Sequence, residues 1–309
     1  MLKAQQLTRQ YGSFTAVNNV SFEIDNKQVI GLLGHNGAGK TTIMKMMTGF
    51  LEPSSGLISI DNIDVNQQRV ETQKRVGYLP ENCPLYPEMT VIDFLLYTAQ
   101  LRNMQYRSAQ RAVQKAIART DLGDKASEQI HTLSRGYRQR VGVAQAILAE
   151  PDILILDEPT NGLDPSQIEN MRELVRELSQ TSTVIISTHV LQEVSAVCDR
   201  VLILKQGELA LDSPLEEIQQ GERLLITVDK QPQEFESELQ LDQFIQTVEY
   251  LGEDRIGYCY RLIPAAQQTL AAITPQITRI LVERGYNVTR IAPEIRDLET
   301  VFREINQPL

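Results

Sequence analysis

A glycine-rich segment has the residue types of a phosphate-binding loop. Residues 29–33 are apolar, and residues 34–41 follow them with the pattern G-x-x-x-x-G-K-T. Glycines let successive backbone N–H groups point at phosphate oxygens, and the N-terminus of a following helix adds positive charge. Lys40 would reach the β- and γ-phosphates, and Thr41 would hold Mg²⁺. The predicted nucleoside triphosphate site comprises Gly34, His35, Asn36, Gly37, Ala38, Gly39, Lys40, Thr41 and Thr42.

Two adjacent carboxylates, Asp157 and Glu158, follow a second apolar run at residues 153–156. A carboxylate at the end of a strand beside a phosphate loop could hold the Mg²⁺ shell, and its neighbour could deprotonate an attacking water. Solvated acids that only cap a strand are the competing interpretation. Because the same chain contains the phosphate loop, we expect Asp157 to hold the metal and Glu158 to act on water.

A third segment, residues 133–140, reads Leu-Ser-Arg-Gly-Tyr-Arg-Gln-Arg and lies between the first two along the chain. Ser134 and Gly136 stand where a helical pattern begins, and basic residues follow them. A helix N-terminus with a hydroxyl and a glycine is suited to an anion. The segment therefore predicts a second contact with phosphate.

These segments, in this order, resemble the nucleotide-binding subunit of ABC transporters, whose signature is LSGGQ. That family has an aromatic residue, a phosphate loop, a glutamine loop, the signature, an Asp-Glu strand, a Leu-Asp loop and a histidine. Residues 1–215 contain all seven in order: Tyr11, Lys40-Thr41, residues 78–81, residues 133–137, Asp157-Glu158, residues 162–164 and residues 187–189. The resemblance implies an ABC ATPase of the α/β P-loop NTPase fold, with ATP and Mg²⁺ as cofactors.

The resemblance also implies roles for single residues. Tyr11 would stack on adenine, Glu158 would be the general base, and His189 would contact the γ-phosphate. From the residues alone, Tyr11 is more often ordinary surface or core, and His189 is more often a satisfied histidine at a strand end. The order of the motifs favours the functional roles.

Subunits of this family work in pairs that sandwich two ATP molecules. A second copy of this chain, or a sister ATPase subunit, is therefore an expected partner. Ser134 and Gly136 would contact the γ-phosphate bound to the opposite subunit, and Asp164 would link the two sites. A monomer should hydrolyse ATP poorly.

Three residues depart from the family pattern. Glu81 stands where the glutamine loop usually has Gln, and the signature has Arg135 in place of Gly and Tyr137 in place of Gln. A carboxylate can still ligate Mg²⁺ or its water, so we expect Glu81 to remain a metal ligand. The departure at Glu81 leaves the coupling to a membrane partner open.

The motifs look closest to the gliding-motility type of bacterial ABC ATPase and its multidrug and polysaccharide export relatives. This resemblance implies ATP hydrolysis that drives a separate multi-span membrane permease, with export as the direction. It also implies a C-terminal accessory domain, whose end is similar to residues 298–302. We expect a dimer-supporting or regulatory role for that domain.

Alternating apolar strands and helices must position these residues. Residues 17–33 change from alternating to continuously apolar, which predicts a strand that enters the centre of a sheet. Strand patterns at 153–156 and 183–187, with helices between them, indicate a mostly parallel core sheet. An antiparallel β subdomain and a helical insert at about residues 88–150 complete the predicted ATP-binding domain, residues 1–215.

Residues 222–309 are predicted to form the small α+β accessory domain. Strand patterns occur at 224–228, 247–250, 258–262 and 286–291, with a polar helical stretch after the first of them. Helical patterns also occur at 265–284 and 298–305. Two helix-strand units of this kind resemble the ferredoxin-like arrangement.

Composition limits the other possibilities. The chain has 309 residues, of which 42% are hydrophobic and 23% charged, so it is neither disordered nor of low complexity. It has no apolar run of the roughly 18 residues that a membrane span needs. A net charge of −10 argues against sequence-independent nucleic-acid binding, and we expect none. Without a secretory signal, the chain is expected in the cytoplasm. The resemblance implies a peripheral position on the inner face of the cell membrane.

Two other functions stay open at this point. One is a soluble ABC ATPase that acts on a nucleoprotein partner, although translation-type members have two nucleotide domains and chromosome-type members have long heptad arms. This chain has a single phosphate loop and a short segment between Lys40 and Ser134. The other is an ATP-gated scaffold that binds ATP but hardly hydrolyses it.

Overall fold

The computed structural model describes residues 1–219, 223–231, 244–265, 268–294 and 297–306. Internal contacts divide the chain into two compact units. The first holds Met1–Leu215 together with the end of the chain from Ile305, and the second holds Glu216–Glu304. Each unit has its own sheets and its own hydrophobic core.

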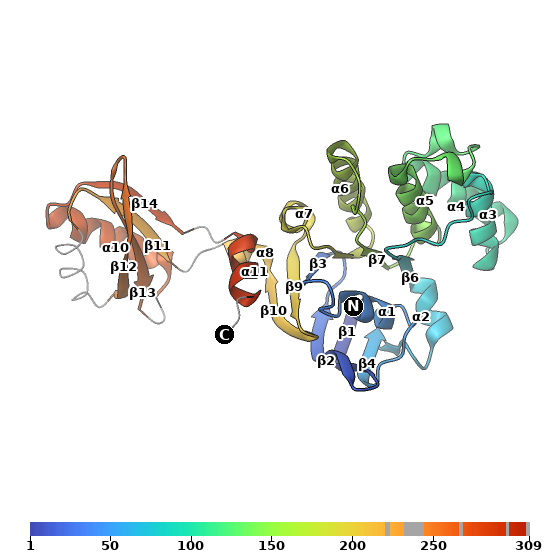
Figure 1. Cartoon of the computed structure of the whole chain (residues 1–309), viewed down its shortest axis with the longest axis horizontal. Helices are drawn as coiled ribbons and strands as arrows, with labels where there is room; N and C mark the ends of the chain where they lie inside the picture. The colour runs from blue at the N-terminus through green and yellow to red at the C-terminus, as the bar shows by residue number, and fades with distance from the viewer. Residues whose placement is uncertain (220–222, 232–243, 266–267, 295–296, 307–309) are drawn as a thin grey trace. The chain divides into compact units, whose positions relative to one another are not determined.

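A six-stranded sheet with the order β10-β9-β3-β8-β7-β6 forms the centre of the first unit (Figure 1). Five strands run parallel, and β10 pairs antiparallel with β9 at one edge. Every residue of β3, β7 and β8 is buried, as expected for strands covered on both faces. The strands are β3 Val29–Leu33, β6 Val76–Leu79, β7 Ile153–Asp157, β8 Thr183–Ser187, β9 Arg200–Lys205 and β10 Glu208–Pro214.

Helices pack on this sheet from several parts of the chain, so the predicted α/β architecture is present. Their contacts join α1 to β7, α2 and α5 to β6, α6 to β8, and α7 to β3. The helices are α1 Lys40–Met47, α2 Arg69–Arg75, α5 Arg135–Ile147, α6 Pro165–Ser179 and α7 Leu191–Val197. The site motifs lie at ends of these elements, because β3, β7 and β8 end where the phosphate loop, Glu158 and His189 begin.

A second, antiparallel sheet has the order β2-β1-β4-β5. Its strands are β1 Leu2–Tyr11, β2 Phe14–Ile24, β4 Ser55–Ile60 and β5 Ile63–Asp64. Met44 and Met46 of α1 share one core cluster with residues of both sheets. The helix that follows the phosphate loop is therefore fixed between two sheets.

The prediction of one strand over residues 17–33 is wrong. β2 belongs to the antiparallel sheet and β3 to the central sheet, and an exposed turn separates them, in which Lys27 has a φ of 60°. The alternating residues belong to β2, which buries only one face of its sheet. The continuous apolar run is β3, which is buried on both faces. The change of pattern thus marks a passage between sheets.

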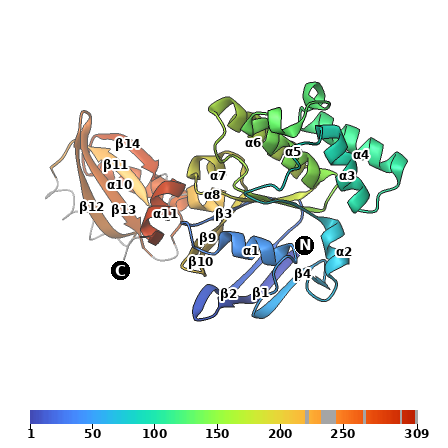
Figure 2. The same cartoon turned by 45° about the vertical axis from the view of Figure 1, so that its right-hand side comes forward.

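A helical part lies between β6 and β7 along the chain. It comprises α3 Val91–Leu101, α4 Tyr106–Arg119, the short 3₁₀ helices Gly123–Lys125 and Ile130–Thr132, and α5. In both views these helices gather away from the antiparallel sheet (Figures 1 and 2). The predicted helical insert is therefore several helices, and α3 and α4 are separated near Asn103, where φ is 58°.

The second unit has one antiparallel sheet with the order β12-β13-β11-β14. Helix α10 connects β13 to β14 and buries Ile273, Ile277 and Leu281 against the sheet. The polar helical stretch suggested after the first strand falls largely on residues 232–243, outside the described residues. The elements are β11 Leu224–Val228, β12 Ile245–Asp254, β13 Gly257–Pro264, α10 Leu270–Glu283 and β14 Val288–Pro293.

Two further helices, α8 Leu215–Gln219 and α11 Leu298–Asn306, occur near the boundaries of the two units. The predicted helix at 265–284 begins later than expected, at Leu270, and it contains Pro275. Across the described ranges, no helix combines the length and the apolar character needed to cross a membrane.

Candidate functional site

The predicted phosphate loop connects the end of β3 to the start of α1. The Ala38 N–H donates to the His35 carbonyl oxygen at 3.0 Å, and Gly37 and Gly39 have φ values of 83° and 105°. Those values lie in the left-handed region that favours glycine. A Cβ at Gly39 would stand 2.7 Å from the carbonyl oxygen of Ala16. The backbone therefore curls as a phosphate-binding loop must.

Lys40 places a buried positive charge under this loop. The residue is 7% exposed, and its Nζ donates to the carbonyl oxygens of Gly34 at 2.8 Å and His35 at 3.4 Å. Both partners are neutral, whereas a buried ammonium is compensated best by an opposite charge. The loop and Lys40 together suit an anion such as a phosphate group.

Asp157 ends β7 and is almost completely buried. Its Oδ1 accepts a hydrogen bond from Ser187 Oγ at 2.5 Å, while its Oδ2 is buried and has no hydrogen-bond partner among the described residues. A buried carboxylate oxygen without a partner is costly unless a cation or water completes it. Carboxylate and hydroxyl oxygens are ligands that Mg²⁺ takes, so the side chains of Asp157, Thr41 and Glu81 have the donor types that fit this ion.

Glu158 is held in an unusual backbone conformation directly after Asp157. Its φ is 50°, and its N–H donates to the carbonyl oxygen of Ser187 at 3.1 Å and to its Oγ at 3.0 Å. Its Oε2 lies 2.9 Å from His189 Nδ1. Burial raises the pKa of the Glu158 carboxyl, and the charges of His189 and Lys40 oppose that shift. A raised pKa makes a carboxylate a better proton acceptor.

The raised pKa predicts that Glu158→Gln stabilises the nucleotide-free fold at pH 8. Ionised Glu158 costs stability above its folded pKa, and this cost disappears below its ordinary value of 4.5. Because Gln cannot ionise, the apparent Tm at pH 8 should be higher in the variant than in wild type. Scanning calorimetry at pH 8 and pH 4 tests this. A variant that melts lower at pH 8, or a gain that persists at pH 4, would argue against it.

One cavity of about 400 Å³ gathers most of the predicted ATP-binding residues. Its size is that of a small-molecule site. Among the predicted residues, its lining includes Tyr11, Asn36, Gly37, Gly39, Lys40, Thr41, Thr42, Glu81, Glu158 and His189. Gly34, His35 and Ala38 belong to the loop, and Asp157 ends β7, but these four do not line the cavity.

Three further residues line the cavity although the sequence motifs did not predict them: Phe14, Ala16 and Asn161. Phe14 pairs with Tyr11 across the β1–β2 turn, and the two rings are 61% and 47% exposed. The sequence feature that could have predicted Phe14 is its aromatic ring, three positions after Tyr11. Both residues line the cavity, so either exposed aromatic side chain could contact a planar adenine ring.

Ser134, Gly136 and Asp164 lie outside the ATP cavity of their own chain. Ser134 Oγ caps α5 by accepting from the Tyr137 N–H at 3.4 Å, and Asp164 Oδ1 caps α6 by accepting from the Gln167 N–H at 2.9 Å. A Cβ at Gly136 would stand 2.6 Å from the Gln167 side chain. The N-termini of α5 and α6 are therefore neighbours, and together they form a surface separate from the lining of the ATP cavity.

Arg135 and Tyr137, which replace Gly and Gln of the family signature, both lie against other residues of this chain. A Cβ at Gly162 would stand 2.4 Å from Cζ of Arg135, so this guanidinium lies directly on the Gly162 backbone. The Tyr137 ring lies 5.7 Å from Lys125 Nζ and 5.6 Å from Arg140 Cζ. Both substituted side chains are thus accommodated beside the start of α5.

Residues 17–161 match the family profile described as "ABC transporter". The chain is 31% identical over 305 residues to YxlF, an uncharacterised ABC transporter ATP-binding protein of Bacillus subtilis (strain 168), and the match covers 99% of each chain. It is 30% identical to the bacitracin transport ATP-binding protein BcrA of Bacillus licheniformis, over 98% of this chain and 96% of that one. A solved dimeric structure of the ATP-binding cassette MJ0796, in a post-hydrolysis state with ADP and Pi, has a TM-score of 0.64 and 25% identity over 70% of this chain and 99% of that one.

Proposed function

This chain belongs to the ABC transporter family of ATP-binding proteins, and we propose that it energises a separate multi-span membrane permease, with export as the direction. It is an ATPase that uses ATP with Mg²⁺, as the family and the ADP- and Pi-bound relative indicate. Transport is supported by the relative named for bacitracin. Assignment to the gliding-motility type stays a prediction from the motifs.

One observation supports the assignment of the site above all others: Lys40, Thr41, Glu158 and His189 line the same cavity. Lys40 would bind the β- and γ-phosphates, and Thr41 the Mg²⁺. When bound, Mg²⁺ neutralises charge on the transferring phosphoryl group. Glu158 would orient the attacking water and accept its proton. His189, which contacts Glu158, would also contact the γ-phosphate.

The remaining predicted residues complete this proposal. Asp157 and Glu81 would complete the Mg²⁺ shell, and Tyr11 would stack on adenine. Ser134 and Gly136 would contact ATP bound to a second copy or a sister subunit, while Asp164 would link the two sites. The dimeric relative supports such a pair.

A groove of about 420 Å³, lined by both apolar and polar side chains, offers a docking site for the permease. Phe50, Val70 and Leu101 contribute to its lining and are 75%, 72% and 64% exposed, and exposed apolar clusters commonly mark interaction sites. Tyr78 of β6 also lines the groove, and Glu81, three residues later, lines the ATP cavity. A permease segment in the groove would therefore sense the state of the ATP site through this short link.

We expect Leu101→Asp to weaken permease binding at least 10-fold. Burying Leu101 contributes about 1.5–3 kcal/mol, and a buried unpaired carboxylate adds a further cost. Tagged Glu158→Gln chain with ATP and Mg²⁺ would capture partners from detergent-solubilised membranes of its own cell, for identification by mass spectrometry. When Leu101→Asp is added to the Glu158→Gln chain, the multi-span membrane protein should no longer be captured. Ile256→Asp, also at an exposed apolar residue, should retain it.

The capture experiment also separates the alternatives. Equal recovery of a multi-span protein with Leu101→Asp would contradict the groove as its docking site. Recovery of ribosomal or DNA-bound proteins without a membrane protein would favour the soluble ATPase. A permease partner would also support a peripheral position on the inner membrane face. We propose residues 1–215 as the ATP-binding domain and residues 222–309 as an accessory domain with a dimer-supporting or regulatory role.

A further inference from the structure

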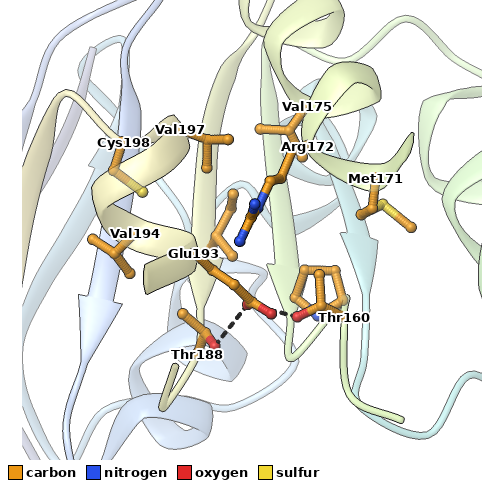
Figure 3. Close-up of a pocket in the computed structure, with 11 residues that line it drawn as sticks. Thr160, Met171, Arg172, Val175, Thr188, Glu193, Val194, Val197 and Cys198 are labelled. Atoms are coloured by element: carbon orange, nitrogen blue, oxygen red, sulfur yellow. Dashed lines mark hydrogen bonds between the residues drawn. The ribbon is translucent and has the colours of Figure 1, made fainter. Parts of the chain in front are cut away.

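A buried carboxylate outside every predicted motif lies beside the ATP site. Glu193 belongs to α7 and is 6% exposed. Its Oε2 accepts hydrogen bonds from Thr160 Oγ1 at 2.6 Å and from Thr188 Oγ1 at 3.0 Å (Figure 3). Both threonines are also buried. Charged acceptors form strong hydrogen bonds, so this carboxylate joins the two hydroxyls firmly.

The surroundings of Glu193 are mostly apolar. A cavity of about 20 Å³ beside it is lined mainly by apolar side chains from α6, β8, α7 and the residue that follows α7: Met171, Val175, Ile186, Val194, Val197 and Cys198. Arg172 lines the same cavity, and its Nη1 pairs with Glu169 at 3.0 Å. A hydrogen bond is stronger in such a medium of low polarity, and an unmade one is more costly.

The two hydroxyls come from different loops of the ATP site. Thr160 lies two residues after Glu158, in the turns that follow β7. Thr188 lies directly before His189, after β8, and its Oγ1 also accepts from the Val190 N–H at 3.0 Å. A single carboxylate therefore bridges the loop that carries Glu158 and the loop that carries His189.

We infer that Glu193 is a positioning residue, which holds these two loops at the spacing where the side chains of Glu158 and His189 meet. This inference rests on the proposed roles of Glu158 and His189. The left-handed backbone of Glu158 persists only if its surroundings fix it, and the bridge through Thr160 contributes to that. Glu193 acts through the threonines, not on ATP.

Removing either hydroxyl should loosen one loop and leave the phosphate loop intact. Thr160→Val and Thr188→Val keep the branched side-chain shape but remove the donor. Because a displacement of about 1 Å can cost about 100-fold in rate, we expect each variant to lower kcat about 10-fold. KM and the affinity for a fluorescent ATP analogue should stay within about twofold of wild type, since Lys40 is unchanged. The double variant should lose little more than the worse single one, because either change breaks the bridge.

Variants of Glu193 separate positioning from simple stability. Glu193→Gln keeps an oxygen that can accept from the hydroxyls, so it should retain more kcat than Glu193→Ala. Thr120→Val is the matched control. Thr120 is 2% exposed, its hydroxyl donates to the Ala116 carbonyl oxygen at 2.7 Å, and it does not line the ATP cavity. This control should melt lower and keep its kcat.

The outcomes are distinct. The role of Glu193 would be overturned if Thr160→Val and Thr188→Val kept the wild-type kcat. It would also be overturned if Thr120→Val lost as much kcat as they do, or if Glu193→Gln and Glu193→Ala lost kcat equally. Hydrolysis that survives Glu158→Gln would instead contradict the proposed catalytic site. The full chain is used throughout, so the two failures can be told apart.

Discussion

Glu158→Gln should lower steady-state ATP hydrolysis by about 10²–10⁴-fold, the usual contribution of a positioned general base. Gln can still hydrogen-bond to water, but it cannot accept a proton. The phosphate loop and Lys40 are unchanged, so ATP affinity should stay close to that of wild type. Phosphate release at saturating ATP and Mg²⁺, together with equilibrium binding of a fluorescent ATP analogue, would measure the two effects separately.

Glu150→Gln is a suitable control for this experiment. Glu150 lies at the surface, where it pairs with Lys115, and it does not line the ATP cavity. Exposed ion pairs contribute little, so this variant should hydrolyse ATP at the wild-type rate. Equal rates in Glu158→Gln and wild type would contradict the general-base role. If that shared rate were very slow, the ATP-gated scaffold would become the better description.

Local residue types explain why much of the site could be predicted. In the phosphate loop, glycine conformations, a buried lysine and a helix start are encoded within eight consecutive residues. β8 occupies the predicted residues 183–187, because its apolar run is buried on both faces. These local residue types and the order of the motifs predicted a P-loop fold and ATPase activity. The structure confirms the fold, and the family match confirms the activity.

Elements that depend on distant partners could not be predicted in the same way. β1 was missed because only its partners, β2 and β4, show which of its residues face the core, and register shifts break its alternation. β10 alternates between intermediate and exposed residues at the sheet edge, so its apolar signal is weak. Glu193 likewise gains a role only when Thr160 and Thr188, 33 and 5 positions away, meet it.

The positions of Ser134, Gly136 and Asp164 illustrate a different limit. Nothing in their local sequence says whether they serve the ATP of their own chain. They do not line the ATP cavity of their own chain, and the family resemblance implies that they act on another copy. Their roles therefore stay predictions that call for a test with two chains.

A mixture of two inactive variants should regain hydrolysis if two copies build each site. Lys40→Ala removes the cation proposed to bind the phosphates. Ser134→Asp places a carboxylate where the γ-phosphate of the opposite subunit would bind, while Asp and Ser cap helices about equally well. Each variant alone should lose at least about 100-fold in rate, because electrostatic contacts to the reacting phosphate contribute that much. Ser134→Asn, an uncharged cap, should lose less and serves as the control.

In a mixed dimer, the Lys40→Ala and Ser134→Asp defects fall in the same site, and the other site is intact. Random pairing puts about half of the chains in mixed dimers, so an equimolar mixture should regain up to about a quarter of the wild-type rate. Phosphate release before and after mixing measures this. A mixture no more active than its components would contradict a shared site. Recovery would require mixed dimers, because neither variant is active by itself.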